Sequence, residues 1–140
     1  MLLNELLSDK GNMYEALILL SEAINPSLDK YAHEIEAFYQ SSKAPSPQVS
    51  ISQGSLKVVF DGIQFSIIQN CEASVAEESK TLAQLAESDQ AQISEVSCRF
   101  ELSSTPDYDM LYFNDYLFML QAADKMGKVW AFKSADGAFI

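Results

Sequence analysis

The sequence predicts a single α+β domain in which N-terminal helices pack on one face of a mainly antiparallel β-sheet. Apolar residues recur at helical spacing before residue 41, and the period changes to two after residue 48. Helices first and strands mostly later are typical of the α+β class. The chain has 140 residues, enough for one core, and no repeat or linker divides it. We therefore expect one domain over residues 1–140.

Two helices are expected in the first forty residues. Asn12 and Glu15 have the spacing of a capping box, and apolar residues at helical intervals follow, which predicts a first helix over residues 13–24. A second helix is expected from Pro26, a residue type favoured at the first helical position, to about Gln40, because an apolar stripe runs along it.

The middle of the chain changes to strands. Alternating apolar and polar residues predict three antiparallel strands between residues 49 and 67. The breaks between them are Gln53-Gly54 and Asp61-Gly62, and the second is a hairpin signal. A third helix over residues 72–87 and a half-buried strand over residues 93–102 then follow from composition and alternation.

The last forty residues allow two interpretations. Residues 108–126 read either as a helix or as two aromatic-rich strands, and their aromatic content favours strands. Residues 128–132, with Trp130 expected in the core, are strand-like, and Asp136-Gly137 is a turn signal.

The two cysteines, Cys71 and Cys98, are expected to be reduced. They stand 27 residues apart, without a Cys-x-x-Cys pair and with a single histidine in the chain, so a metal site is not expected. The first ten residues lack the basic and apolar regions of a secretory leader, and no apolar run reaches the length of a membrane span. These observations favour the cytoplasm.

Acidic residues dominate the charge. Twenty acidic side chains against nine basic ones give a net charge of −11, which repels phosphate backbones and anionic membranes. Nucleic acid and membranes are therefore not expected partners. Residues 71–124 hold eleven acidic and two basic residues, a net charge of −9. Such concentrated charge favours a basic protein partner, although acidic residues also serve solubility alone.

No motif predicts a reaction or a cofactor. The five glycines form no phosphate-binding loop, and Gly-x-Ser-x-Gly is missing. The only histidine, His33, lies away from the apolar stripe of its helix and is expected in solvent. A calcium loop counted from Asp107 fails, because Tyr112 and Phe118 stand where Gly and Glu are required. We expect no enzyme, no cofactor and no metal.

Residues 105–118 are the strongest candidate for a binding surface, with five aromatic residues and three aspartates. Tyrosine offers a large contact area, and aspartate pairs with arginine, as at the centre of tight interfaces. In the competing interpretation the phenylalanines are core and the aspartates merely solvated. With one acidic residue from the neighbouring strand, the predicted partner-binding residues are Asp107, Tyr108, Asp109, Tyr112, Asp115 and Glu101.

These features predict a non-catalytic binding module for a basic protein. The most concrete version is an immunity protein that occludes the electropositive site of a nuclease-type bacterial toxin, since an acidic surface can take the place of phosphate. One alternative is an acidic secretion chaperone for an exported effector. The other is an NTF2-like small-molecule-binding or enzyme domain, a likeness of element order alone. The sequence leaves the oligomeric state open.

Overall fold

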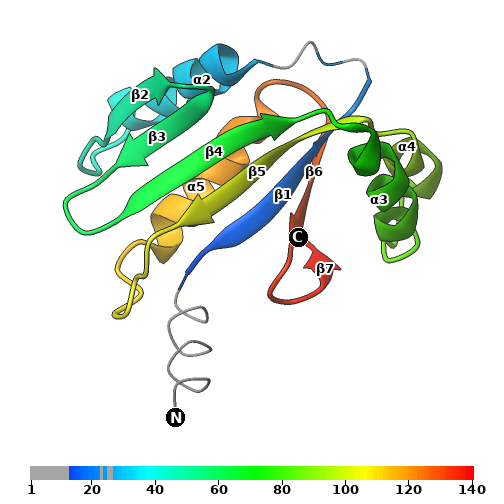
Figure 1. Ribbon diagram of the computed structural model, residues 1–140. Helices are drawn as coiled ribbons and strands as arrows, with labels where there is room; N and C mark the ends of the chain where they lie inside the picture. The colour runs from blue at the N-terminus through cyan, green and yellow to red at the C-terminus, as the bar shows by residue number, and fades with distance from the viewer. Residues whose placement is uncertain (1–12, 23, 25–26) are drawn as a thin grey trace.

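The fold is built on one seven-stranded antiparallel sheet with the strand order β2-β3-β4-β5-β1-β6-β7. The computed structural model describes residues 13–22, 24 and 27–140. The predicted α+β class is confirmed (Figure 1). The elements are β1 (Glu15–Leu20), α2 (Leu28–Gln40), β2 (Gln48–Ser52), β3 (Ser55–Val59), β4 (Gln64–Asn70), α3 (Ala73–Ala83), α4 (Gln90–Ser94), β5 (Cys98–Ser104), α5 (Phe113–Asp124), β6 (Val129–Lys133) and β7 (Ala138–Phe139).

Helices cover the two faces of the sheet unequally. Helices α2 and α5 lie against one face and enclose the main core, which contains Tyr31, Phe65, Phe100 and Tyr116 (Figure 1). The other face is covered only at one end, where α3 and α4 bury a smaller cluster around Leu19. The sheet therefore has one fully covered face and one partly open face.

Helix α2 confirms the second predicted helix, although it begins at Leu28, and the expected first residue, Pro26, lies outside the described residues. Its N-cap is Ser27, whose hydroxyl accepts a hydrogen bond from the Lys30 amide at 3.0 Å. The apolar stripe is buried at Tyr31, Ile35 and Tyr39. His33, on the opposite side of the helix, is exposed as predicted.

The three predicted strands between residues 49 and 67 are confirmed as β2, β3 and β4. Gln53 and Gly54 both have positive φ, 52° and 74°, as a type I′ hairpin turn requires. The third predicted helix is confirmed as α3, although it ends at Ala83. The predicted strand over residues 93–102 is partly wrong: residues 90–94 form the short helix α4, and β5 begins only at Cys98.

The first predicted helix is wrong, because residues 15–20 form strand β1. This strand lies between β5 and β6, and its C-terminal half is buried on both faces: Ile18 enters the main core and Leu19 the smaller cluster. A strand buried on both faces is a continuous apolar run without alternation, and a short run of this kind is easily taken for a helix. Asn12 of the supposed capping box lies outside the described residues.

The strand interpretation of residues 108–126 is also wrong, because α5 occupies residues 113–124. Tyr116, Met119, Leu120 and Ala123 are its buried residues at helical spacing. The aromatic composition of this segment favours strands, but its buried residues recur at the spacing of a helix, and the segment is helical. The predicted strand after this helix is confirmed as β6, where Trp130 packs half-buried against the smaller cluster.

The expectation of reduced cysteines is wrong as well. Cys71 and Cys98 form a disulfide with an S–S distance of 2.13 Å. Because Asn70 pairs with Arg99, the two cysteines follow directly at the end of the β4–β5 ladder. The disulfide joins the two ends of the segment that contains α3 and α4. Among the described helices none has the length and apolar character needed to cross a bilayer.

Candidate functional site

The six predicted partner-binding residues occupy three different environments. Asp107, Tyr108 and Asp109 belong to the loop between β5 and α5, Tyr112 and Asp115 line a pocket at the start of α5, and Glu101 lies on the partly open face of the sheet. Tyr112 connects the first two environments. They lie at one end of the sheet, and Glu101 is separate from them.

Asp107 is buried, with 5% of its surface exposed, and organises the loop that follows it. Its Oδ2 accepts hydrogen bonds from the Tyr14 hydroxyl at 2.6 Å and the Tyr112 amide at 2.9 Å. Its Oδ1 accepts from the Leu111 amide at 3.1 Å. Burial, and then the hydrogen bond to Asp107, raise the pKa of the Tyr14 hydroxyl. The carboxylate is therefore used inside the protein, where it holds the loop in shape.

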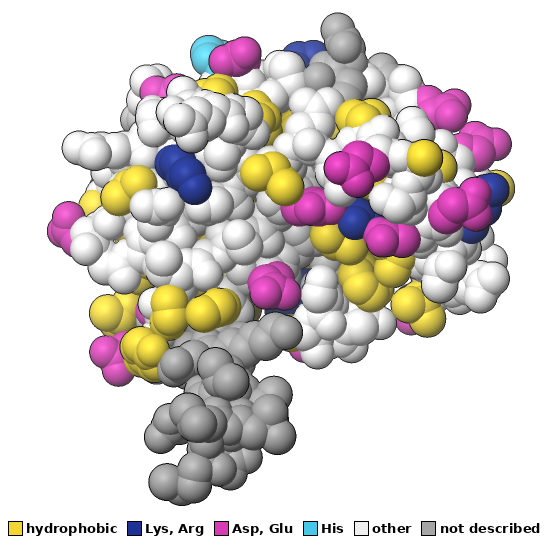
Figure 2. Space-filling model, in the orientation of Figure 1, with side chains coloured by type: hydrophobic (Ala, Val, Ile, Leu, Met, Phe, Trp, Pro, Cys, Tyr) yellow, Lys and Arg dark blue, Asp and Glu magenta, His cyan; other side chains and the backbone are white. Residues whose placement is uncertain are grey.

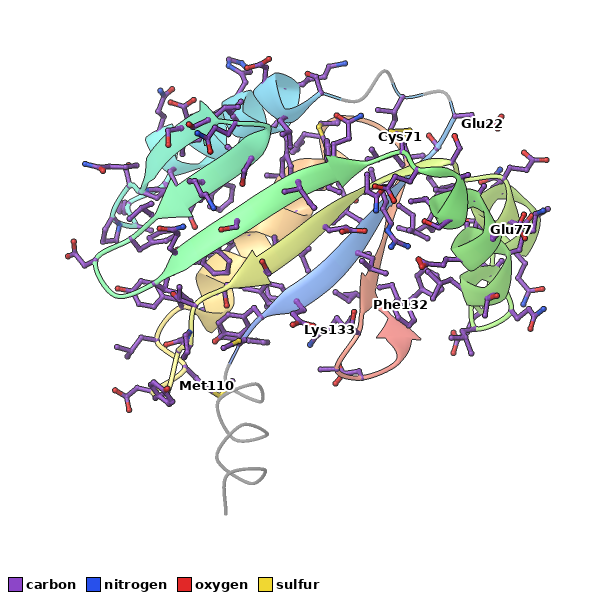
Figure 3. All side chains as sticks on the ribbon, in the orientation of Figure 1. Glu22, Cys71, Glu77, Met110, Phe132 and Lys133 are labelled. Atoms are coloured by element: carbon purple, nitrogen blue, oxygen red, sulfur yellow. A yellow bond between two sulfur atoms is a disulfide. The ribbon has the colours of Figure 1, made fainter. Side chains whose placement is uncertain are left out.

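Residues 108–111 form an exposed tip on this loop. Met110 has 59% and Leu111 73% of its surface exposed, and Tyr108 and Asp109 are exposed beside them. Met110 has a φ of 56°, a conformation that non-glycine residues adopt mainly where the surroundings fix it. Figure 3 places Met110 at the outer end of the loop. The tip therefore exposes the apolar side chains of Met110 and Leu111 and the Asp109 carboxylate to solvent on a backbone of fixed conformation.

Beside this tip lies a pocket of about 520 Å³ between the β3–β4 hairpin, the loop before β2 and the start of α5. Its aromatic side is formed by Phe60 and Tyr112, whose ring centroids are 5.4 Å apart. The Tyr112 hydroxyl accepts a hydrogen bond from the Gly62 amide at 3.0 Å. A Cβ atom added at Gly62 would lie 3.1 Å from the Tyr112 ring and hydroxyl, so glycine allows this close approach.

The pocket carries negative charge and no lining Lys or Arg. Asp61 and Asp115 contribute the carboxylates, and the nearest base along the lining segments is Lys43, exposed in the loop that leads to Pro45. Asp115 Oδ1 accepts a hydrogen bond from the Tyr39 hydroxyl at 2.6 Å. Burial, and then this bond, raise the pKa of Tyr39. Carboxylates beside aromatic rings suit a cationic group such as a guanidinium or ammonium.

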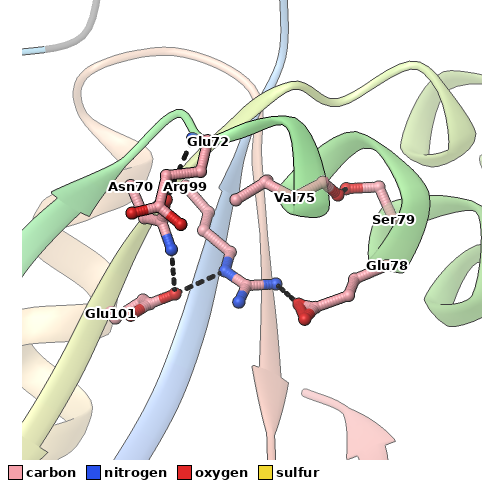
Figure 4. Close-up of polar contacts among 7 residues, drawn as sticks. All are labelled: Asn70, Glu72, Val75, Glu78, Ser79, Arg99 and Glu101. Atoms are coloured by element: carbon pink, nitrogen blue, oxygen red, sulfur yellow. Dashed lines mark hydrogen bonds and ion pairs between the residues drawn. The ribbon is translucent and has the colours of Figure 1, made fainter.

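Glu101 has a structural partner on the open face of the sheet (Figure 4). Its Oε2 accepts hydrogen bonds from Arg99 Nε at 2.8 Å and from Asn70 Nδ2 at 3.0 Å. Arg99 Nη1 lies 2.7 Å from Glu78 Oε2 of α3, an ion pair without hydrogen-bond geometry. Only 9% of the Arg99 side chain is exposed. The network ties α3 to the sheet, so Glu101 has a role apart from the other predicted residues.

The acidic side chains are unevenly spread over the face in view. Figure 2 shows them gathered over the α3 end, with basic side chains among them. Exposed acids there include Glu72, Glu77 and Glu78, and Lys80 lies 3.4 Å from Glu77. This part of the surface is thus partly neutralised, whereas the pocket of Tyr112 and Asp115 is lined by no base.

Sequence reasoning missed Phe60 and Asp61, and it did not select Met110 and Leu111 although they lie within the predicted segment 105–118. Asp61 was interpreted only as a turn residue, because nothing local indicates that Gly62 meets Tyr112 fifty positions later. In the parts of the chain that the structure describes, no group of three or more His, Cys, Asp or Glu side chains is arranged to hold a metal ion.

Comparison with protein-family models, with curated proteins and with solved structures finds no match to this chain.

Proposed function

We propose that this protein is a non-catalytic binding module for a basic protein, and that the pocket of Tyr112 and Asp115 with the neighbouring tip is its contact surface. The observation that carries the proposal is that two carboxylates and two aromatic rings line one pocket without a basic neighbour in its lining. A Lys or Arg side chain of the partner would place its charge between Asp61 and Asp115 and stack on Tyr112.

The tip supplies the second part of the surface. Met110 and Leu111 are apolar side chains that already stand in solvent, so a partner that covers them gains hydrophobic contact area. Asp107 fixes the backbone beneath them, which lowers the entropy lost on binding. The most concrete partner class is a basic, nuclease-type bacterial toxin, whose electropositive site an acidic immunity protein would occlude.

The disulfide bears on where this binding takes place. Disulfides form and persist in oxidising compartments and are rare in the cytosol. The bond between Cys71 and Cys98 therefore argues against the expected cytoplasmic location. We propose that the protein meets its partner outside the reducing cytoplasm, where it would occlude a nuclease-type toxin before the toxin reaches nucleic acid in the cytoplasm. Thiol labelling of freshly lysed cells tests this point: blocked cysteines support the proposal, and free cysteines support the cytoplasm.

Co-purification tests the binding function. Basic proteins encoded beside the gene are expressed with this chain, and the complex is challenged at low and high salt. Charge-led association weakens as the Debye length falls from roughly 10 Å at 0.1 M to about 3 Å at 1 M salt. A complex that forms equally well at both salt concentrations, or no complex with any basic protein, would count against the proposal.

Charge reversal at the surface locates the contact. Asp61→Lys and Asp109→Lys change exposed residues, so the fold should be unaffected, while association with the captured partner slows and affinity falls by about tenfold or more. Glu95→Lys is the matched control, because Glu95 is an exposed acid at the end of α4, outside the pocket. Equal effects of all three variants would assign the binding to net charge instead of this pocket.

A further inference from the structure

A second cleft, of about 480 Å³, lies at the β6–β7 edge of the sheet. Its walls come from the α3–α4 connection, α4, α5 and the two edge strands. It shares no lining residue with the pocket of Tyr112 and Asp115. The predicted binding function does not use it.

Strand β6 has an open backbone edge inside this cleft. Strand β7 pairs only with Phe132 and Lys133, and the Ile140 amide adds one bond to the Ala131 carbonyl at 2.9 Å. Backbone groups alternate between the two sides of a strand, so the amide and carbonyl of Val129 point to the same side as those of Ala131. No strand of the described chain lies opposite Val129 on that side.

The cleft has an apolar wall on each side of this open edge. On the side of the main core the wall includes Leu117 and Leu120 of α5. On the side of the smaller cluster it includes Ile93 and Trp130. Leu85 has 56% of its surface exposed at the rim. A strand placed beside Val129 would direct its alternate side chains to these two walls.

The charges in the cleft complement a cation. Glu87 and Asp124 are its lining carboxylates, and no Lys or Arg lines it. Burial raises the pKa of Asp124, while Lys128 and Lys125 lower it. Lys128 does not line the cleft, and its ammonium is paired with another carboxylate: its Nζ is 3.1 Å from Asp89 Oδ2 and 5.7 Å from the centre of the Trp130 ring.

We propose that this cleft binds an extended segment of a partner protein, which pairs with β6 at Val129 and carries alternating apolar side chains flanked by Lys or Arg. The backbone bonds to Val129 would give general affinity, the two walls would select the apolar residues, and Glu87 and Asp124 would select the flanking bases. The inference goes beyond the proposed function and does not rest on it, since the two sites are lined by different residues.

A titration of the full chain with short peptides tests the proposal. The probe is the acetylated, amidated peptide Arg-Val-Leu-Val-Arg, observed by amide NMR and amide hydrogen exchange. We expect the Val129 signal to shift and its exchange to slow. The same peptide with proline at its centre, and one with Glu in place of Arg, should bind at least about tenfold more weakly. Equal binding of all three peptides, or shifts confined to the pocket of Tyr112, would overturn the proposal.

Two protein variants make the test specific. Leu85→Glu changes an exposed rim residue, and Val129→Pro removes the edge amide together with the half-buried Val129 side chain, at an edge position where strands tolerate proline. Each variant should bind the peptide Arg-Val-Leu-Val-Arg about tenfold more weakly than the unmodified protein does. Leu111→Glu, which alters an exposed apolar residue of the tip, is the control and should leave peptide binding unchanged. Unchanged binding to a correctly folded Leu85→Glu variant would refute the cleft, whereas the Asp109→Lys result bears only on the proposed function.

Discussion

Asp107 is the residue on which the shape of the exposed tip over residues 108–111 depends, because its buried carboxylate accepts hydrogen bonds from one hydroxyl and two amides. A hydrogen bond to a charged group contributes more than one between neutral groups, about 1.5–3 against roughly 1 kcal/mol. The hydroxyl donor is Tyr14, the residue directly before β1, and the two amide donors belong to Leu111 and Tyr112 at the end of the loop. The Asp107 side chain therefore links the conformation of the loop to the position of Tyr14 beside the sheet.

Removal of the Tyr14 hydroxyl tests this coupling. Tyr14→Phe should lower the free energy of unfolding by about 2 kcal/mol, because the buried Asp107 carboxylate loses one of its donors. Tyr116→Phe is the matched comparison, since its hydroxyl donates to the neutral Glu15 carbonyl at 3.0 Å, and it should cost roughly half as much. Urea unfolding of both variants measures the difference. Equal losses would mean that the Asp107 contact is no stronger than a neutral one.

Asp89 is a second residue with a testable charge effect. The hydrogen bond from Trp130 Nε1, at 3.0 Å, and then the contact with Lys128 lower the pKa of Asp89 below its ordinary value of 3.8. A lowered pKa means that the ionised form stabilises the fold at pH values above the ordinary pKa, and that this stability is lost as the pH falls through the folded value.

Asp89→Asn should therefore reduce the stability near neutral pH and flatten the acid side of the stability profile. Trp130 fluorescence during urea unfolding between pH 7 and about pH 3 measures this change. Glu95→Gln, which neutralises an exposed acid at the end of α4, is the control for simple charge removal. A profile of Asp89→Asn parallel to that of the unmodified protein would contradict the assignment.

At the scale of elements, the sequence predicted what depends on short-range pattern. Helix α2 and the hairpins of β2, β3 and β4 follow from periods and turn residues within a few positions. Strand β1 and helix α5 could not be identified in this way. Burial on both faces removes the alternation of apolar and polar residues in β1. The aromatic residues of α5 pack in the core against β1 and α2, a tertiary contact that local composition does not indicate.

The predicted partner-binding residues show the same limit. Composition alone selected Tyr108, Asp109, Tyr112 and Asp115, which the fold places at one end of the sheet. It also selected Asp107, because no local signal distinguishes a carboxylate that will be buried by Tyr14 from one that stays in water. The contribution of the β3–β4 hairpin to the pocket depends on tertiary contacts and was not predictable.

The disulfide is the element-scale constraint with the clearest measurable effect. It closes a loop of 27 residues in sequence separation, so its removal should lower the free energy of unfolding by about 3.5 kcal/mol, mainly through the unfolded chain. The β4–β5 ladder and the Arg99–Glu78 ion pair already hold α3 near the sheet. We therefore expect α3 and α4 to stay in place.

Urea unfolding of Cys71→Ser with Cys98→Ser measures the loss, and Trp130 fluorescence in the native state reports on the packing of α4. The unmodified protein under a strong reductant provides the comparison. A native-state spectrum that changes on reduction would show instead that the disulfide positions α3 and α4.

For the whole molecule, the net charge of −11 opposes the compact state through self-repulsion. Added salt screens this repulsion, so the Tm at pH 7 should rise between low and moderate NaCl concentrations. Near the sequence pI of about 4.3 the net charge vanishes, and the same salt should change the Tm little. Calorimetry at both pH values measures how the Tm depends on the salt concentration. A Tm that falls with salt at pH 7 would indicate that ion pairs outweigh the repulsion.

The central position of β1 has a consequence for how the chain reaches this structure. The strand comes early in the sequence, but its neighbours come late: Glu15 pairs with Ser103 and Leu17 with Phe132. During synthesis the apolar strand β1 therefore remains without its neighbours β5 and β6 until almost the entire chain has been made. Closing such distant contacts is slow and leaves the segment prone to aggregation. Assembly of this protein is accordingly expected to be most vulnerable before β5 and β6 have emerged.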